Sequence, residues 1–159
     1  KSLILGSSAL NGTSLVTTTH KDQNYTKAVE WFTKSSAQGN SAAMTDLGFR
    51  YEHGEGCDQN MNKAVELYEK GAQLGSSAAM LYLANCYKDG TGATKDINKA
   101  VDWYTKASVQ GNRFAMSNLG VCYENGDGVT KDLNKAKEWY TKAAAQGDED
   151  AKTRLAALK

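Results

Sequence analysis

The sequence predicts an all-α protein, a right-handed α-solenoid of antiparallel helix pairs with a repeat of 36 residues. Three observations predict this fold. Small and apolar residues recur at a fixed step, each unit contains two amphipathic segments, and each segment has its own start and stop signals. A solenoid buries its core as a row of contacts between neighbouring units, so a chain of 159 residues does not imply one globular core.

The fixed step is visible at positions that keep the same residue type along the chain. These positions are Ala28, Ala64, Ala100 and Ala136; Gly39, Gly75, Gly111 and Gly147; Ala43, Ala79, Ala115 and Ala151; and Leu47, Leu83, Leu119 and Leu155. A period of this length is typical of helical repeat arrays. We therefore predict one repeat domain (1–159), with a partial leading repeat at 1–40, full repeats at 41–76, 77–112 and 113–148, and a C-terminal capping helix at 149–159.

The leading repeat is the least regular part of the sequence. Its Leu5-Gly6 pair stands at the same distance from the next glycine as Leu119-Gly120 does, which predicts that the chain starts within a first helix. The connection from there to Ala28 is longer than its counterpart in the third full repeat. We expect the additional residues to form an extended surface loop near residues 14–23, centred on residues 16–21.

Each full unit is predicted to contain two helices that pack closely. In the first helix small and apolar residues share one face, as do Ala43, Met44, Leu47, Gly48 and Tyr51; in the second the same holds for the positions of Ala28, Trp31, Phe32 and Ser35. The small residues at 48, 84 and 120 indicate close approach of a neighbouring helix, with the aromatic residue at 32, 68, 104 or 140 filling the space beside them.

Glycine and short polar residues mark the boundaries of these helices. Gly39 is placed as a left-handed residue after one helix, and Asn40 as the N-cap of the next. The pair recurs at Gly75-Ser76, Gly111-Asn112 and Gly147-Asp148, and we expect the second helices to be capped by Asn60, Asp96 and Asp132. At the end of the chain Lys152 and Lys159 replace apolar residues of the other units, as a terminal capping helix requires.

The second helices also share an outward charge pattern. Acidic and basic residues stand four apart at Glu30-Lys34, Glu66-Lys70, Asp102-Lys106 and Glu138-Lys142. Such pairs stabilise an exposed helix by about 0.2 to 0.5 kcal/mol each. We expect this outer face to be a solvated surface without a recognition role.

Composition and residue chemistry argue against several functions. The formal net charge is +1, whereas a nucleic-acid-binding protein normally has a basic excess. No stretch reaches the roughly 18 apolar residues that cross a membrane. Cys86 and Cys122 occupy equivalent places and fit small buried residues. With His20 and His53 as the only histidines, no catalytic or metal-binding spacing is present. We expect no enzyme activity, no cofactor and no metal.

The third full repeat resembles the Sel-one-like repeat (SLR) family, which is related to the tetratricopeptide repeats. The residues that carry the resemblance are Ala115, Leu119, Gly120, Tyr123, Gly126, Gly128, Val129, Lys131, Asp132, Lys135, Ala136, Trp139, Tyr140, Lys142, Ala143, Ala144 and Gly147. The resemblance extends over residues 24–159. It implies a tetratricopeptide-like architecture, in which the first helices line a concave groove that holds a peptide or a partner protein.

Recognition is expected at inner positions that vary between units, because invariant positions are explained by packing. These partner-binding candidates are Thr45, Phe49 and Glu52 in the first full repeat; Leu81, Tyr82, Asn85 and Lys88 in the second; and Phe114, Ser117, Val121 and Glu124 in the third. Phe49, Leu81, Phe114 and Val121 are apolar, and apolar side chains gathered on one exposed strip indicate an interaction surface.

The sequence thus predicts an adaptor or protein-interaction module whose partner is a protein or peptide. An alternative is that the chain is a segment of a longer assembly scaffold. Some cysteine-rich relatives are described as penicillin-binding or β-lactamase-like enzymes, and those relatives carry a regular pair of cysteines in each repeat. The three cysteines Cys57, Cys86 and Cys122 do not form such pairs.

Overall fold

The computed structural model describes the backbone of residues 12–158 and the side chains of residues 20–158. The Leu5-Gly6 pair of the predicted leading helix lies outside these residues. Between residues 12 and 158 the chain forms helices and no strand. The helices are α1 (Gly12–Ala37), α2 (Ser41–His53), α3 (Met61–Gln73), α4 (Ser77–Asp89), α5 (Ile97–Val109), α6 (Arg113–Asn125), α7 (Leu133–Ala145) and α8 (Glu149–Ala157).

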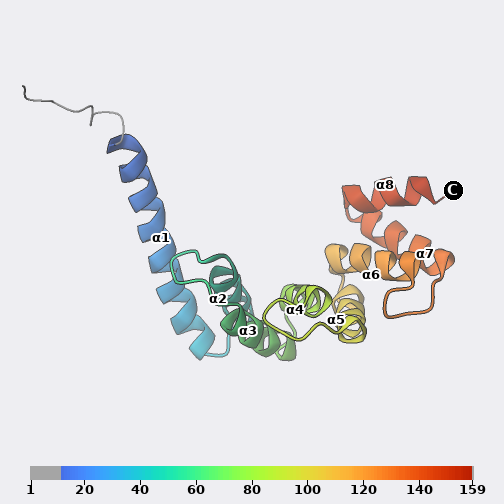
Figure 1. Cartoon of the computed structure of the whole chain (residues 1–159), viewed down its shortest axis with the longest axis horizontal. Coiled ribbons are helices and arrows are strands. Elements are labelled where there is room, and N and C mark those ends of the chain that lie inside the picture. Colours follow the sequence, from blue (N-terminus) through green and yellow to red (C-terminus); the bar gives the residue numbers. More distant parts are fainter. Residues whose placement is uncertain (1–11, 159) are drawn as a thin grey trace, which may run out of the picture.

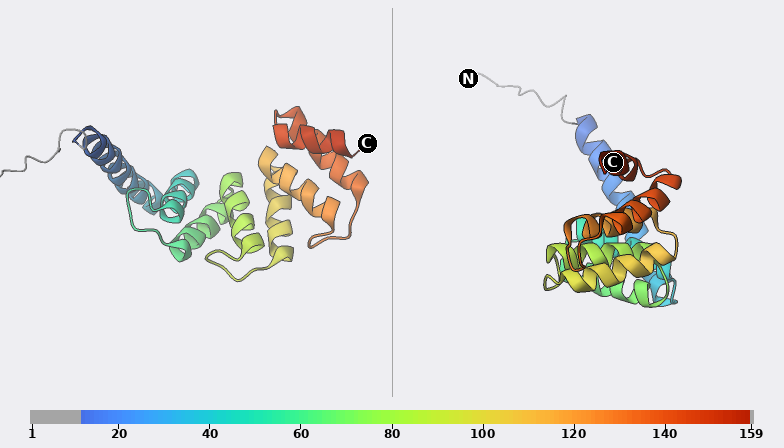
Figure 2. Two further views of the ribbon diagram at one scale, coloured as in Figure 1. Left: turned by 45° about the horizontal axis from the view of Figure 1, so that its top comes forward. Right: turned by 90° about the vertical axis from the view of Figure 1, so that its right-hand side faces the viewer.

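The helices form a curved array, with α1 at one end and α7 and α8 at the other (Figures 1 and 2). Helices α2, α4 and α6 lie along the inner side of the curve, and their partners α3, α5 and α7 along the outer side (Figure 1). Each inner helix packs against the outer helix that follows it, and each outer helix packs against the next inner helix. The arrangement confirms the predicted all-α solenoid.

The two helices of a unit meet where a small residue faces an aromatic ring. Tyr68, Tyr104 and Tyr140 are fully buried. A Cβ atom added at Gly48 would lie 2.7 Å from the ring of Tyr68, and one at Gly120 would lie 2.5 Å from the ring of Tyr140. The close approach predicted from the small residues is confirmed, and it sets the spacing between inner and outer helices.

The predicted helix boundaries are confirmed as well. Side-chain oxygen atoms cap the N-termini of α2 to α8; they belong to Asn40, Asn60, Ser76, Asp96, Asn112, Asp132 and Asp148. Each accepts a hydrogen bond from a backbone N–H of the first turn, which would otherwise have no partner. These caps fix where each helix begins, and therefore which side chains it presents to the inner side.

The expected surface loop near residues 14–23 is wrong, because one continuous helix, α1, spans Gly12–Ala37. Between Gly12 and Gly39 the sequence contains neither glycine nor proline, so nothing interrupts the helical hydrogen bonds. The loop was inferred from spacing alone. On the same helix Trp31 is 75% exposed, although the equivalent residues of the later repeats, Leu67, Trp103 and Trp139, are half-buried.

The loops inside the units connect neighbouring repeats. The loop between α4 and α5 passes so close to α3 that a Cβ atom at Gly92 would lie 2.6 Å from the carbonyl oxygen of Met61. Gly128 stands in the same relation to Ile97 of α5. The loops of Gly92 and Gly128 therefore pack on the start of the preceding outer helix and hold two units in register.

The outer face differs from the expected row of ion pairs. Within residues 20–158 only Glu66 and Lys70 form the predicted pair, with 2.6 Å between Lys70 Nζ and a Glu66 carboxylate oxygen. In the next two units the corresponding lysine lies over a tryptophan ring instead; the distances to the ring centres are 4.1 Å for Lys106 over Trp103 and 4.4 Å for Lys142 over Trp139. Leu67 stands at the tryptophan position in the first full repeat, so Lys70 has no ring to cover and pairs with Glu66.

No helix in the described part of the chain is both long and apolar enough to cross a membrane.

Candidate functional site

The predicted partner-binding residues all lie on the three inner helices α2, α4 and α6. Helix α2 carries Thr45, Phe49 and Glu52; α4 carries Leu81, Tyr82, Asn85 and Lys88; and α6 carries Phe114, Ser117, Val121 and Glu124. The structure separates these residues into three groups: some are buried between repeats, some accept hydrogen bonds from buried tyrosines, and some face the inner surface.

Thr45, Leu81 and Ser117 are buried, which corrects the expectation that they form part of an exposed strip. Leu81 is only 8% exposed and belongs to the hydrophobic core. The Thr45 hydroxyl donates to the Ser41 carbonyl oxygen at 2.8 Å and lies 2.9 Å from the hydroxyl of Ser76, the N-cap of α4. The three residues occupy equivalent positions of the repeat, and at Thr45 this position faces the next inner helix. The sequence pattern of one helix alone does not reveal that the next helix covers these side chains.

Glu52, Asn85 and Glu124 accept hydrogen bonds from the buried tyrosines. In each case the tyrosine hydroxyl donates to a side-chain oxygen, and the two oxygen atoms are 2.5 Å apart. The pairs are Tyr68 to Glu52, Tyr104 to Asn85, and Tyr140 to Glu124. Burial raises the pKa of each of these tyrosines above the ordinary value, so the hydroxyl groups remain protonated donors. These three site candidates therefore stabilise the helix pairs.

The exchange of acceptors explains part of the variation that the sequence analysis assigned to recognition. Lys88 stands where the other two full repeats have Glu52 and Glu124, so Tyr104 has no carboxylate at that register. The side-chain oxygen of Asn85, one turn earlier on α4, accepts the hydroxyl hydrogen instead. A buried hydroxyl group must find an acceptor, so a change at one position is compensated at a nearby one.

A double-mutant cycle tests this structural role. We expect Glu52→Ala to lower the free energy of unfolding by about 1 to 2 kcal/mol, because the Tyr68 hydroxyl loses its acceptor. In a Tyr68→Phe background the same substitution should have a much smaller effect. Urea unfolding of the four proteins measures the coupling. Equal effects of Glu52→Ala in both backgrounds would show that the hydrogen bond does not contribute.

Phe49 and Tyr82 form the centre of an aromatic cluster between α2 and α4. The ring of Phe49 stacks on His53 with 4.0 Å between ring centres, and it lies 6.0 Å from the ring of Tyr82 at a tilt. Tyr82 stacks in turn on the buried Tyr68 at 5.2 Å. The outer members of this cluster are partly exposed, so an aromatic surface borders the inner side of the array.

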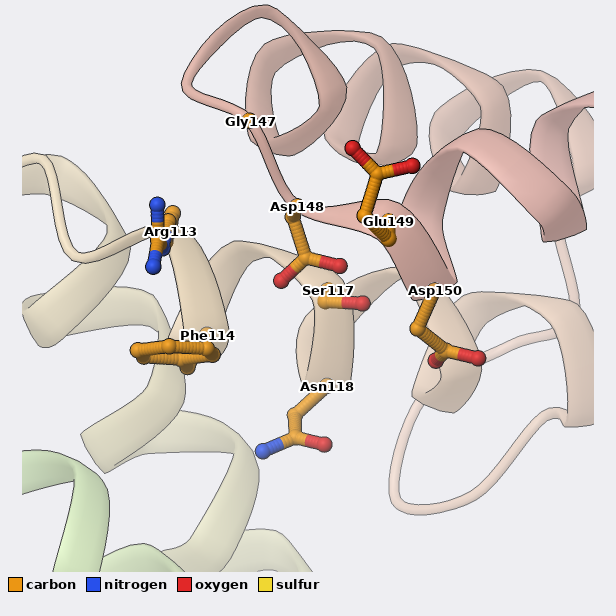
Figure 3. A pocket seen from close by; sticks show the side chains of 8 residues that line it. All are labelled: Arg113, Phe114, Ser117, Asn118, Gly147, Asp148, Glu149 and Asp150. Atoms are coloured by element: carbon orange, nitrogen blue, oxygen red, sulfur yellow. The ribbon is translucent and has the colours of Figure 1, made fainter.

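A cavity of about 390 Å³ opens between the first turns of α6 and α8 (Figure 3). Its lining residues are Arg113, Phe114, Ser117, Asn118, Gly147, Asp148, Glu149 and Asp150. Phe114 is 52% exposed at this cavity, and the guanidinium group of Arg113 lies 4.7 Å from its ring centre. Figure 3 shows Arg113 and Phe114 on one side and the acidic residues of α8 on the other.

Most polar groups around this cavity already have partners. Arg113 donates to the Gln146 carbonyl oxygen at 3.0 Å, and Asp148 accepts from the backbone N–H of Ala151 at 2.8 Å. The carboxylates of Glu149 and Asp150 are paired with basic side chains of α8. Phe114 is therefore the large side chain of the cavity that remains available for an apolar contact.

The sequence analysis found Phe114 and Ser117 but missed the other half of the cavity. Asn118 and the first residues of α8 escaped notice because each helix was considered separately. A usable signal existed, since Asp148 follows the cap position of Asn112 by one repeat, and the inner helices α2 and α4, which are also one repeat apart, are in contact. That relation places the start of α8 next to α6.

The remaining predicted residues do not make a single continuous strip. Val121 packs against the C-terminal hydrophobic cluster and is partly buried. Lys88 Nζ lies 3.7 Å from a carboxylate oxygen of Asp89. The inner face thus has two separate candidate regions, the aromatic cluster on α2 and α4 and the cavity between α6 and α8.

Two of the three cysteines fill buried positions of the repeat, as their equivalent places in the sequence predicted. Cys86 and Cys122 are buried, and burial raises the pKa of each thiol to about 11. At neutral pH both are protonated and unreactive. Cys57 is partly exposed, and all three are free thiols. Within residues 12–158 no three His, Cys, Asp or Glu side chains are arranged to hold a metal ion.

The Sel1 repeat model matches the chain at residues 19–40, 41–76, 77–112 and 113–148. Two solved structures resemble it at over 30% identity. A Sel1 repeat protein from Oxalobacter formigenes is 34% identical with a TM-score of 0.77, over 83% of this chain and 54% of that one. The protective antigen c5321 of uropathogenic Escherichia coli, which displays an SLR fold, is 32% identical with a TM-score of 0.80, over 84% of this chain and 29% of that one.

A third structure, cysteine-rich protein B of Helicobacter pylori, is 25% identical with a TM-score of 0.67, over 84% of this chain and 96% of that one. The chain spans about half of the length of the Oxalobacter formigenes protein and less than a third of that of c5321. No curated protein matches the sequence. Sel1 repeats are helical modules that generally mediate protein interactions, and the matched repeats cover most of this sequence. The chain belongs to the Sel1 repeat family.

Proposed function

We propose that this chain is a non-catalytic module that binds a segment of a protein or a peptide along the inner face of its helices. The observation that carries the proposal is Phe114, a large apolar side chain that is half-exposed at the cavity between α6 and α8. Exposed aromatic residues beside a cavity are common anchors of protein recognition. The aromatic cluster around Phe49 and Tyr82 provides a second contact region on the same side of the array.

The family and the chemistry of the described residues agree with this proposal. The matched repeats of this chain include the inner helices α2, α4 and α6, which carry Phe49, Tyr82 and Phe114. The buried cysteines and tyrosines have their ordinary protonation states, and their polar atoms serve the packing of the repeats. These observations support recognition at the inner surface.

Peptides selected from a displayed library against the chain provide the test. We expect Phe114→Glu to weaken their binding by about tenfold, the loss that corresponds to 1.4 kcal/mol of contact energy. Val109→Glu is the matched control, because Val109 is 77% exposed but lies at the end of the outer helix α5. Fluorescence anisotropy gives the affinities, and circular dichroism checks that both variants are folded.

Amide hydrogen exchange, measured with and without the peptide, shows which helices the bound peptide covers. Protection should appear on α2, α4, α6 and α8 if the peptide lies along the inner face. Equal affinities for both variants, or protection confined to α3, α5 and α7, would contradict the proposal.

A further inference from the structure

The cavity between α6 and α8 contains polar groups that lie deeper than Phe114. Ser117 and Asp148 line this cavity, and each is only 6% exposed. Figure 3 shows the Asp148 side chain reaching from the start of α8 toward Ser117 of α6. The cavity volume of about 390 Å³ falls in the range of about 300 to 1,000 Å³ that is usual for binding pockets. A long side chain of a bound segment therefore fits into it.

The hydroxyl group of Ser117 has no hydrogen-bond partner among residues 20–158, although the side chain is buried. At the equivalent position of the first full repeat, the Thr45 hydroxyl donates to the Ser41 carbonyl oxygen and lies 2.9 Å from the Ser76 hydroxyl. Buried polar groups are normally hydrogen-bonded. A buried hydroxyl group that faces a cavity without a partner indicates a ligand that provides one.

Asp148 brings a buried negative charge to the same cavity. One carboxylate oxygen accepts a hydrogen bond from the backbone N–H of Ala151 at 2.8 Å, and no described basic side chain forms an ion pair with Asp148. The N-caps of the other inner helices, Asn40, Ser76 and Asn112, are neutral, so capping does not require the charge. A helix N-terminus stabilises a negative charge by only about 0.3 to 1 kcal/mol. The rest of the cost of burying it is met by a cation or by further hydrogen bonds.

The other charged side chains of the lining are engaged elsewhere. Glu149 and Asp150 pair with basic side chains of α8, at 2.6 and 3.0 Å between nitrogen and oxygen atoms. The guanidinium group of Arg113 lies over the ring of Phe114 and donates to a backbone carbonyl oxygen at 3.0 Å, without an ion pair to Asp148. Asp148 is therefore the carboxylate of this cavity that has no cation within ion-pair distance among the described residues.

We propose that this cavity takes a lysine or arginine side chain of the bound segment, whose cationic group meets Asp148 and Ser117 while its methylene groups lie along Phe114. The inference rests on the proposed function, because it specifies one residue of the segment that lies along the inner face. A cationic N–H group supplies the charge that Asp148 lacks and the donor that the Ser117 oxygen accepts. An acidic side chain would be repelled by Asp148. An apolar one would leave both polar groups buried without partners.

The test uses peptides from the displayed library that lose affinity for the Phe114→Glu variant. Each is remade with lysine, arginine, norleucine or glutamate at every position in turn. Norleucine keeps the methylene groups of lysine and lacks the charge. We expect one position to prefer lysine or arginine over norleucine by about tenfold, as a charge-assisted contact in a partly buried cavity provides, with glutamate binding worst.

Asp148→Asn is the decisive variant, because asparagine caps α2 and α6 at the equivalent positions and the start of α8 should be kept. It should reduce the preference for lysine over norleucine to about twofold or less, with the affinity of the norleucine peptide unchanged. Asp148→Ser repeats the test with the cap that α4 uses. Asp132→Asn is the matched control, since Asp132 caps the outer helix α7 and asparagine caps α3 at the equivalent position. The control should keep the full preference.

A second variant, Ser117→Leu, fills the cavity. Leucine is compatible with this position of the repeat, because Leu81 occupies it in the second full repeat and is buried there. We expect the affinity of the lysine peptide to fall by about tenfold, since the side chain loses both its space and one acceptor. Circular dichroism and urea unfolding check that this variant and the Asp148 variants are folded.

The outcomes separate this inference from the function on which it rests. If Phe114→Glu weakens binding but no position prefers a basic residue, the basic anchor is wrong and the inner binding face stands. The same holds if Asp148→Asn keeps the preference or Ser117→Leu keeps the affinity. If no selected peptide depends on Phe114, both proposals fail. A preference that Asp148→Asn removes and Asp132→Asn keeps, together with the loss in Ser117→Leu, supports the basic anchor.

Discussion

Replacing Gly92 by alanine is expected to lower the free energy of unfolding by about 3 kcal/mol. The backbone of Gly92 has φ = +68°, a left-handed conformation that is unfavourable for a residue with a side chain. The added Cβ atom would also lie 2.6 Å from the Met61 carbonyl oxygen and 2.9 Å from a methyl carbon of Val65. A backbone carbonyl cannot turn away as a flexible side chain can, so the loop would have to move off α3.

Gly111→Ala is the matched control for this prediction. Gly111 has φ = +89°, yet a Cβ atom at that position would meet nothing within 4 Å. It should lose about 1 kcal/mol, the conformational part of the effect alone. Urea unfolding of both variants measures the difference. Similar losses would show that the contact between the loop and the preceding helix contributes little to stability.

The contact between Gly92 and α3 also affects how tightly the first and second full repeats are coupled. A repeat array is stabilised largely by the interfaces between neighbouring units, and the loop forms part of that interface. The Gly92→Ala variant should therefore loosen the junction of the first and second full repeats. Because the inner helices α2 and α4 meet at this junction, its integrity decides whether the contact between Phe49 and Tyr82 is kept.

The sequence predicted those features that depend on short-range rules. The caps from Asn40 to Asp148 and the turns before them follow from local hydrogen bonding and left-handed glycine. The pairing of a small residue with a ring, as at Gly120 and Tyr140, follows from the repeat itself, since both positions recur at the same step. Such features need no knowledge of distant parts of the chain.

The sequence did not predict contacts that depend on the neighbouring unit or on the exact side chain. Leu81 was expected on the surface because the pattern of one helix does not reveal the next inner helix. Asn85 was assigned to recognition although it replaces an acceptor for Tyr104. A comparison of positions 52, 88 and 124 with the tyrosine they face would have shown this compensation.

The candidate binding surface was therefore predicted in outline only. The inner helices were correctly identified, and Phe49, Tyr82 and Phe114 are exposed or partly exposed as expected. The pairing of Glu124 with Arg154 of α8 could not be recognised in advance, because it depends on which basic side chains lie close to each carboxylate in space. Pairing distances in space, such as those of Arg154, decide that question.

Replacing Gly120 by valine is the second substitution with a large expected effect, a loss of about 3 kcal/mol in the free energy of unfolding. A Cβ atom at Gly120 would lie 2.5 Å from the ring of Tyr140, and valine adds two methyl groups beyond it. Tyr140 is fully buried and donates to Glu124, so the ring has little room to withdraw. The helices α6 and α7 would have to separate.

The second full repeat provides the control, because Ala84 stands at the same register beside Tyr104. That pair shows that the helices of a unit accommodate one methyl group at this position. Gly120→Ala should thus change stability by about 1 kcal/mol or less, since its higher helix propensity offsets a small shift of the ring. Urea unfolding and near-ultraviolet circular dichroism of Tyr140 and its neighbours measure both variants. If valine were tolerated as well as alanine, the distance between the paired helices would be set by contacts other than this one, and the recurrence of small residues at 48, 84 and 120 would need a different physical cause.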